Sequence, residues 1–238
     1  MIIDYSQNLF QSNGCNSAKV IHCVESKITN EQNSMLLTPF SATEVKEALF
    51  DMHPEKSLGP DDMNPAFCQR FWHIVGEDVI SACLQFVKDC FFPAGLNDTS
   101  IVLIPKKQKP EILSDMRPIA LCNVLYKILS KMLANSMKLV LDLVISDSQS
   151  AFVPSRAITD NIIISAEIMH FLKRKRQGKQ GVAALKIDMS KAYDMVEWGF
   201  QQAMMLKLGF DPKWVDLVML CMSTVHYMCS ERVKKLGQ

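Results

Sequence analysis

The sequence predicts an α+β fold that is rich in helices and has short antiparallel strands. Three observations indicate this class. Apolar residues recur at helical spacing in several stretches, most clearly over residues 124–144. Two short apolar runs, residues 101–104 and 116–121, flank a polar connection and predict a long hairpin. A third apolar run, residues 182–187, has the length and composition of a buried strand.

Composition indicates a globular protein with a hydrophobic core but does not indicate a binding partner. The chain has 238 residues, of which 48% are hydrophobic, which is enough for one sizeable core. Its 26 basic and 25 acidic residues nearly cancel. Net charge therefore does not indicate nucleic acid, and any basic surface has to come from local clustering.

The cysteines and the apolar segments predict an intracellular chain, nuclear or cytoplasmic, with no membrane partner. Its eight cysteines include no C-x-x-C pair and lie mostly in apolar segments, so we expect reduced core thiols. No Cys/His grouping has the spacing of zinc ligands. The start does not resemble a signal peptide, and no apolar run reaches about 18 residues.

The amino-terminal part is predicted to be a linker followed by helices. Residues 1–37 are polar and rich in Asn and Ser, which is typical of a lead-in or linker. Ser41 and Glu44 have capping-box spacing and predict a helix to about Met52. A turn-rich loop over 56–65 should follow, and then two helices, at about 65–74 and 77–90.

Asp61 and Asp62 invite a metal-site interpretation, but turn residues are the better one. A Pro-Asp step favours a turn, and no third ligand lies near them in the sequence.

The predicted hairpin carries a concentration of basic residues. Its polar connection includes Lys106 and Lys107, and Arg117 stands directly before Pro118 and must be extended. From the residues alone, an ion pair between Arg117 and Asp115 is as good an interpretation as a ligand contact.

The helix predicted over 124–144 places Lys127, Lys131 and Lys138 on one side. Such a stripe can be a solvated helix face, or it can line a groove that attracts nucleic-acid phosphates. Both interpretations stay open. A polar turn is expected next, and then a helix from Thr159, as its cap, to about Leu172.

The strand predicted over 182–187 ends at Asp188, where a carboxylate can hold a metal, and the carbonyl of Met189 can add an oxygen ligand. Asp194 and Glu197 have capping-box spacing, so Asp194 is interpreted as the cap of a helix that ends at Gly209. A further helix from about 211 to 222 and a short strand over 224–230 are expected to follow.

Four segments, in order, resemble reverse transcriptases of the LINE-type non-LTR retrotransposons, particularly those of plants. They read SLGPDDMNPAFCQRFW, then IVLIPKK with SDMRPIALCNVLYKILSKMLAN, then SDSQSAFVPSRAITDNI, and LKIDMSKAYDMVEW. The family has Gly where Asp62 and Ser155 stand here. The resemblance implies a partial domain of a right-hand polymerase over 38–238, with fingers at about 38–180 and a truncated palm at about 181–238.

The resemblance also implies roles for individual residues. Its activity is RNA-directed DNA polymerisation, with an RNA template, a DNA primer, dNTPs and two Mg²⁺ ions about 4 Å apart. Asp188 is the expected catalytic residue and, with Met189, the expected metal ligand. The expected nucleotide contacts are Lys106, Lys107, Arg117 and Tyr193, the last as a gate against a 2′ hydroxyl. The expected template contacts are Lys127, Lys131, Gln149, Phe152 and Arg156.

The family's second carboxylate motif, Tyr/Phe-Ala-Asp-Asp, does not occur between Asp188 and Gln238. We therefore expect this chain to be a polymerase fragment that is inactive alone. Two alternatives remain at this point, a non-catalytic nucleic-acid-binding remnant and an unrelated helical interaction module.

Overall fold

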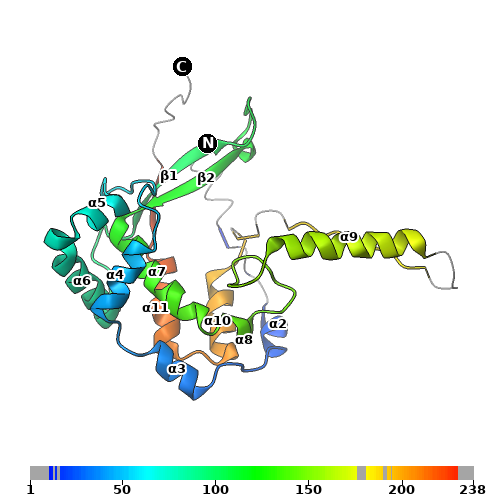
Figure 1. Cartoon of the computed structure of the whole chain (residues 1–238), viewed down its shortest axis with the longest axis horizontal. Coiled ribbons are helices and arrows are strands. Elements are labelled where there is room, and N and C mark those ends of the chain that lie inside the picture. Colours follow the sequence, from blue (N-terminus) through cyan, green and yellow to red (C-terminus); the bar gives the residue numbers. More distant parts are fainter. Residues whose placement is uncertain are drawn as a thin grey trace.

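The computed structural model describes residues 11–12, 14, 17–175, 181–189, 192–193 and 195–229. Figure 1 shows a helical body from which the hairpin of β1 and β2 and the long helix α9 project in different directions. The helices are α2 (Ala18–His22), α3 (Asn30–Leu36), α4 (Ala42–Phe50), α5 (Pro65–Arg70), α6 (Trp72–Asp89), α7 (Val124–Lys138), α8 (Leu141–Val144), α9 (Ile158–Arg174), α10 (Trp198–Leu208) and α11 (Pro212–Ser223). The strands are β1 (Asp98–Pro105), β2 (Met116–Cys122) and β3 (His226–Cys229).

One core forms where α4, α5, α6 and α7 meet. Its most buried side chains include Val45, Leu49, Cys83 and Ile128, each of which is fully enclosed. The predicted capping box starts α4, since the Ser41 hydroxyl accepts a hydrogen bond from the Glu44 N–H and the Glu44 carboxylate accepts one from the Ser41 N–H. Burial of these apolar side chains stabilises the fold by about 25 cal/mol for each Å² removed from water. It fixes α7 against α4, α5 and α6.

A second core joins α3 to α10 and α11 around the fully buried Trp214. Gly209 ends α10 with a φ of 99°, the left-handed cap that the sequence predicts. The Asn33 side chain donates to the Gly209 carbonyl at 2.7 Å and accepts from the Asp211 N–H at 2.8 Å. These bonds, together with the buried Ile28 and Leu36, place part of the predicted linker in the core.

The predicted hairpin is present, and the predicted α+β class is confirmed, but the sheet is mixed rather than antiparallel. β1 pairs with β2 antiparallel, with Ile104 opposite Arg117, and it pairs with β3 in parallel, with Thr99 opposite Tyr227. The parallel pairing brings the end of the described chain beside the base of the hairpin.

The prediction of a buried strand over residues 182–187 is wrong. Residues 181–189 have no strand structure, and Val182, Leu185 and Ile187 are exposed. An apolar run becomes a buried strand only when neighbouring strands and a covering layer pair with it, and within the described residues the sheet is made by β1, β2 and β3 alone.

Two predicted helix starts are also wrong. α10 begins at Trp198 with Glu197 as its N-cap, and Glu197 makes no side-chain capping bond, so the helix does not begin at Asp194. Asp194 itself lies outside the described residues. α9 begins at Ile158 after Ala157, which places Thr159 inside the first turn rather than at the cap.

Ser155 and Asp62, the two positions where the related family has Gly, both have positive φ, at 63° and 54°. Replacing Ser155 by Gly should remove left-handed strain and raise the free energy of unfolding by about 0.5–1 kcal/mol. Urea unfolding of Ser155→Gly against Ser155→Ala tests this, because alanine keeps the strain. Equal midpoints for the two variants would contradict it.

Candidate nucleic-acid and nucleotide interface

The tip of the hairpin is held by its own lysines. The Lys106 ammonium donates to the Ser114 carbonyl at 2.8 Å, and Lys107 forms an ion pair with Asp115 at 2.8 Å. The hydrogen bond from Lys107 is the main cause that lowers the pKa of Asp115 to about 2, and the N–H groups of Glu111 and Ile112 contribute. Both lysines therefore shape the tip in this structure.

Arg117 is left with a free guanidinium. It is exposed on β2, and within the described residues no hydrogen bond or ion pair reaches it. The expected alternative, an Arg117–Asp115 pair, is wrong because Asp115 is taken by Lys107. A guanidinium is always charged and presents a fork of donors, so this position is suited to binding phosphate or carboxylate oxygens.

A cavity of about 480 Å³ lies between β2, α7 and the loop after α4. Successive side chains of a strand alternate between its faces, so Arg117, Ile119 and Leu121 lie on one face of β2. The lining includes Ile119 and Leu121 from this face and also Ala120 and Cys122 from the other, and Arg117 lies on the same strand, two residues before Ile119 and outside the lining. The polar side chains in the lining are Lys56, Ser57, Lys127, Ser130 and Lys131.

We call this cavity, with Lys56, Lys127 and Lys131, the basic groove. The Lys127 ammonium donates to the Ser57 carbonyl at 2.6 Å, while Lys131 lies 3.5 Å from the exposed carboxylate of Asp51. No acidic residue lines the groove itself. The lining therefore carries three ammonium groups and no carboxylate, and the groove has a net positive charge, with Asp51 beside Lys131 at its edge.

The loop that carries Lys56 is fastened to the start of α7. The Asp61 carboxylate accepts from the Val124 N–H at 2.8 Å, and the Asp61 N–H donates to the Asn123 side chain at 3.0 Å. Gly59 lies so close to the Cys122 backbone that an added Cβ would be 2.4 Å from the Cys122 oxygen. Asp61 is thus a cap for a distant helix, which local sequence could not show.

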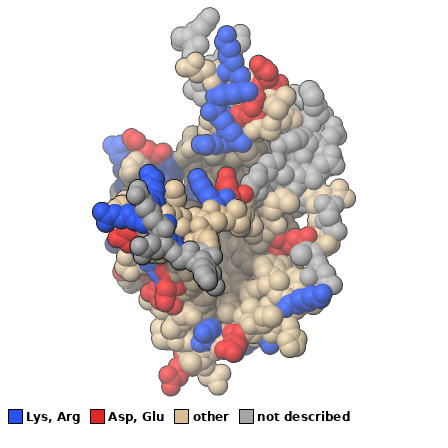
Figure 2. Space-filling model, turned by 90° about the vertical axis from the view of Figure 1, so that its right-hand side faces the viewer, with Lys and Arg blue, Asp and Glu red and all other residues tan. Residues whose placement is uncertain are grey.

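Basic residues also gather at the projecting end of the molecule. Figure 2 shows Lys and Arg side chains clustered at the top, where the hairpin ends in Figure 1, with acidic side chains beside them. Lys106, Lys107 and Lys109 are exposed there. The local clustering that net charge does not reveal is therefore present.

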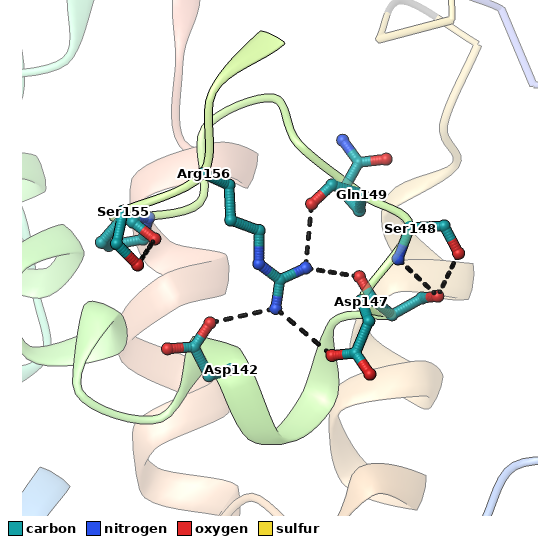
Figure 3. A network of polar contacts seen from close by, with 8 residues as sticks. Asp142, Asp147, Ser148, Gln149, Ser155 and Arg156 are labelled. Atoms are coloured by element: carbon teal, nitrogen blue, oxygen red, sulfur yellow. Dashed lines mark hydrogen bonds and ion pairs between the residues drawn. The ribbon is translucent and has the colours of Figure 1, made fainter. Parts of the chain in front are cut away.

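Arg156, expected to contact template, is the centre of an internal network (Figure 3). Its guanidinium donates to the carbonyls of Ser146, at 2.6 Å, and Gln149, at 2.9 Å. It also pairs with Asp142 at 3.1 Å and lies 3.8 Å from Asp147. With its side chain only 17% exposed, Arg156 holds the loop between α8 and α9 in shape.

This loop presents Gln149 and Phe152 to solvent. The Gln149 amide donates to the Ala151 carbonyl at 3.3 Å, so the side chain stays on its own loop. Phe152 is 83% exposed and has a φ of 63°. Its ring makes an edge-to-face contact with Tyr193, which brings an expected template residue beside an expected nucleotide residue.

Asp188, Met189 and Tyr193 are all exposed. In the part of the chain that the structure describes, no three Asp, Glu, His or Cys side chains come together so that they could hold a metal ion. Mg²⁺ binding needs several oxygen ligands, so the described residues do not make a Mg²⁺ site by themselves.

Comparisons with known proteins identify the family of this chain and one relative. The sequence profile of the family "Reverse transcriptase (RNA-dependent DNA polymerase)" matches residues 104–237, which include β2, α7, Arg117 and Asp188. The "Transposon TX1 uncharacterized 149 kDa protein" of Xenopus laevis is 30% identical over 188 residues, 79% of this chain. The chain spans 14% of the length of that relative.

The helices add one negative finding and the comparisons add the family. None of the described helices combines the length and the apolar character needed to cross a bilayer. The profile covers more than half of the chain, and it includes the hairpin arginine and the part of the basic groove formed by β2 and α7. The chain belongs to the reverse transcriptase (RNA-dependent DNA polymerase) family.

Proposed function

We propose that this chain is the nucleotide- and template-binding part of a LINE-type, non-LTR retrotransposon reverse transcriptase of a plant, acting inside the cell on RNA template, DNA primer and dNTPs. The observation that carries the proposal is the Arg117 guanidinium, which has no partner among the described residues and stands on β2, the strand whose later residues line the basic groove. A relative whose name identifies it as a transposon protein supports the retrotransposon origin.

In this proposal Arg117 binds the triphosphate of the incoming nucleotide. Its fork of donors can bind two phosphate oxygens at once, and it has no internal partner among the described residues to give up. Lys106 and Lys107 are the other proposed triphosphate contacts. To bind phosphate oxygens, Lys106 must release the Ser114 carbonyl and Lys107 must release the Asp115 carboxylate. Arg117 is therefore the leading contact.

The basic groove is proposed to bind the template backbone through Lys127 and Lys131. Lys56 lines the same cavity and is proposed as a third contact. Phosphodiester groups attract such a cluster regardless of base sequence. Gln149 and Phe152 are proposed as further template contacts on their own loop, which Arg156 holds in shape.

We predict that the basic groove sets the salt dependence of RNA binding. Changing Lys56, Lys127 and Lys131 together to Gln should reduce the slope of log K against log salt by about 2, because each phosphate contact to a single strand contributes about 0.7. Fluorescence anisotropy with a 12-nucleotide RNA at several salt concentrations measures it. The control changes Lys19, Lys88 and Lys207, which are exposed outside the groove. Equal slopes for the two triple variants would refute the groove as the site.

Asp188, with the carbonyl of Met189, is the proposed contribution of this chain to the metal site of the family. Asp188 is its one carboxylate at a metal-binding position of the family motif, and two Mg²⁺ ions need several. The residues present do not satisfy that requirement, so we assign no catalytic step to this chain alone.

We predict that the purified 238-residue chain does not extend a DNA primer on an RNA template with Mg²⁺ and dNTPs. Asp188→Asn is the control, because a contaminating polymerase would give the same activity in both samples. Extension by the parent that disappears in Asp188→Asn would show that other residues of this chain complete the site.

A non-catalytic nucleic-acid-binding role is the second candidate function. The observation that favours it is that the groove lysines are gathered in one place, while the described carboxylates are not. RNA binding that depends on the groove, without any dATP binding at Arg117, would support this role over the polymerase fragment.

A further inference from the structure

Phe152 and Tyr193 come from distant parts of the sequence and meet as a pair on the surface. Their ring centroids are 5.9 Å apart and their planes cross at 79°. Both rings are otherwise open to solvent, with Phe152 83% and Tyr193 76% exposed. An edge-to-face pair with this spacing is attractive.

The loop holds Phe152 in a conformation that an aromatic residue rarely adopts. The φ of Phe152 is 63°, in the left-handed region that is costly for any residue except Gly. Arg156 fixes the loop through the carbonyls of Ser146 and Gln149, and the Ser150 hydroxyl bonds the Asn161 side chain of α9 at 3.1 Å. Val153, next to Phe152, is buried. The surroundings thus force the ring outward against Tyr193.

We propose that Phe152 is a positioning residue for Tyr193, and that it sets how well the site distinguishes a deoxyribonucleotide from a ribonucleotide. The proposal rests on the nucleotide site proposed above, with Tyr193 as the gate against a 2′ hydroxyl that the family resemblance implies. Rejection of one hydroxyl by a ring requires that the ring be held in place. Tyr193 is largely exposed, and among the described residues Phe152 makes the ring contact that can hold it.

The first arm of the test measures the contact without nucleotide. The chain contains four tyrosines, so 3-fluorotyrosine labelling gives few ¹⁹F resonances, and Tyr193→Phe identifies the one from Tyr193. Phe152→Ala should shift this resonance, while Phe91→Ala, which removes another exposed phenylalanine, should leave it unchanged. An unshifted resonance in Phe152→Ala would overturn the proposal.

The second arm measures discrimination as the ratio of the dissociation constants of ATP and dATP, by calorimetry on the 238-residue chain. Phe152→Ala should lower the ratio by about three- to tenfold, the range of one aromatic pair, while Phe152→Tyr should keep it. Phe152→Gly removes the ring and also the strain at φ 63°, so it should lower the ratio as alanine does. A merely structural role would change both constants together and leave the ratio constant.

The outcomes separate this inference from the proposed function. If Tyr193→Ala lowers the ratio and Phe152→Ala does not, the positioning role of Phe152 is wrong, and the role of Tyr193 as a gate against the 2′ hydroxyl is supported. If Tyr193→Ala leaves the ratio unchanged, or dATP does not bind at all, the proposed nucleotide site is wrong, and the positioning role is overturned with it.

Discussion

Replacing Gly59 by alanine is expected to lower the free energy of unfolding by about 3 kcal/mol. The added Cβ would stand 2.4 Å from the Cys122 oxygen, 2.5 Å from its carbonyl carbon and 2.6 Å from the Asn123 nitrogen. All three atoms belong to the backbone at the end of β2 and the start of α7, so no side-chain rotation can relieve the clash. The loop with Lys56 would have to move away from α7, and the basic groove would open.

The matched control is Gly199→Ala in α10, where an added Cβ meets nothing within 4 Å. This change should raise stability by roughly 0.5–1 kcal/mol, because alanine loses less backbone entropy in a helix than glycine does. Urea unfolding followed by circular dichroism measures both variants. A Gly59→Ala variant as stable as the parent would mean that the loop does not pack on α7 as described.

Local signals in the sequence predicted much of the helical body. The Ser41–Glu44 box starts α4, Gly209 ends α10, and Asp211 with Pro212 starts α11. Each of these features depends on residues a few positions apart, so the sequence alone contains the information. The hairpin was also predictable, because its two strands are close in the chain.

Features that depend on distant contacts were missed. The run 182–187 has the composition of a strand, yet strand formation requires partners that composition does not supply. Asn33 is a polar residue in an apparent linker, but its amide joins α3 to the turn before α11. Arg156 was expected to contact template, while in the structure its guanidinium donates to loop carbonyls and pairs with Asp142.

In the candidate site, too, some residues were predicted from the sequence, and one that depends on distant contacts was missed. The resemblance in sequence pointed to Arg117, Lys127 and Lys131, and the structure places the two lysines in one cavity that is also lined by the strand that carries Arg117. Lys56 was missed because contacts between distant residues place its loop. The bond between Asp61 and Asn123, which fastens the loop at the start of α7, joins residues 62 positions apart in the sequence.

Replacing Arg117 by alanine is expected to weaken dATP binding by about ten- to a hundredfold, the equivalent of losing about 1.5–3 kcal/mol of charged hydrogen bonding. Because no described residue pairs with Arg117, its loss should not destabilise the fold, and the melting temperature should stay within about 1–2 °C of the parent. Arg117→Lys should fall between the two, since it keeps the charge but loses the planar fork. Arg174→Ala, an exposed arginine on α9, is the matched control.

Calorimetric titration of dATP into the parent, Arg117→Ala and Arg174→Ala at one fixed salt concentration tests the proposed function most directly. The proposal predicts that only Arg117→Ala loses affinity, by at least tenfold, with its fold intact. Equal affinity of the parent and Arg117→Ala for dATP would contradict it.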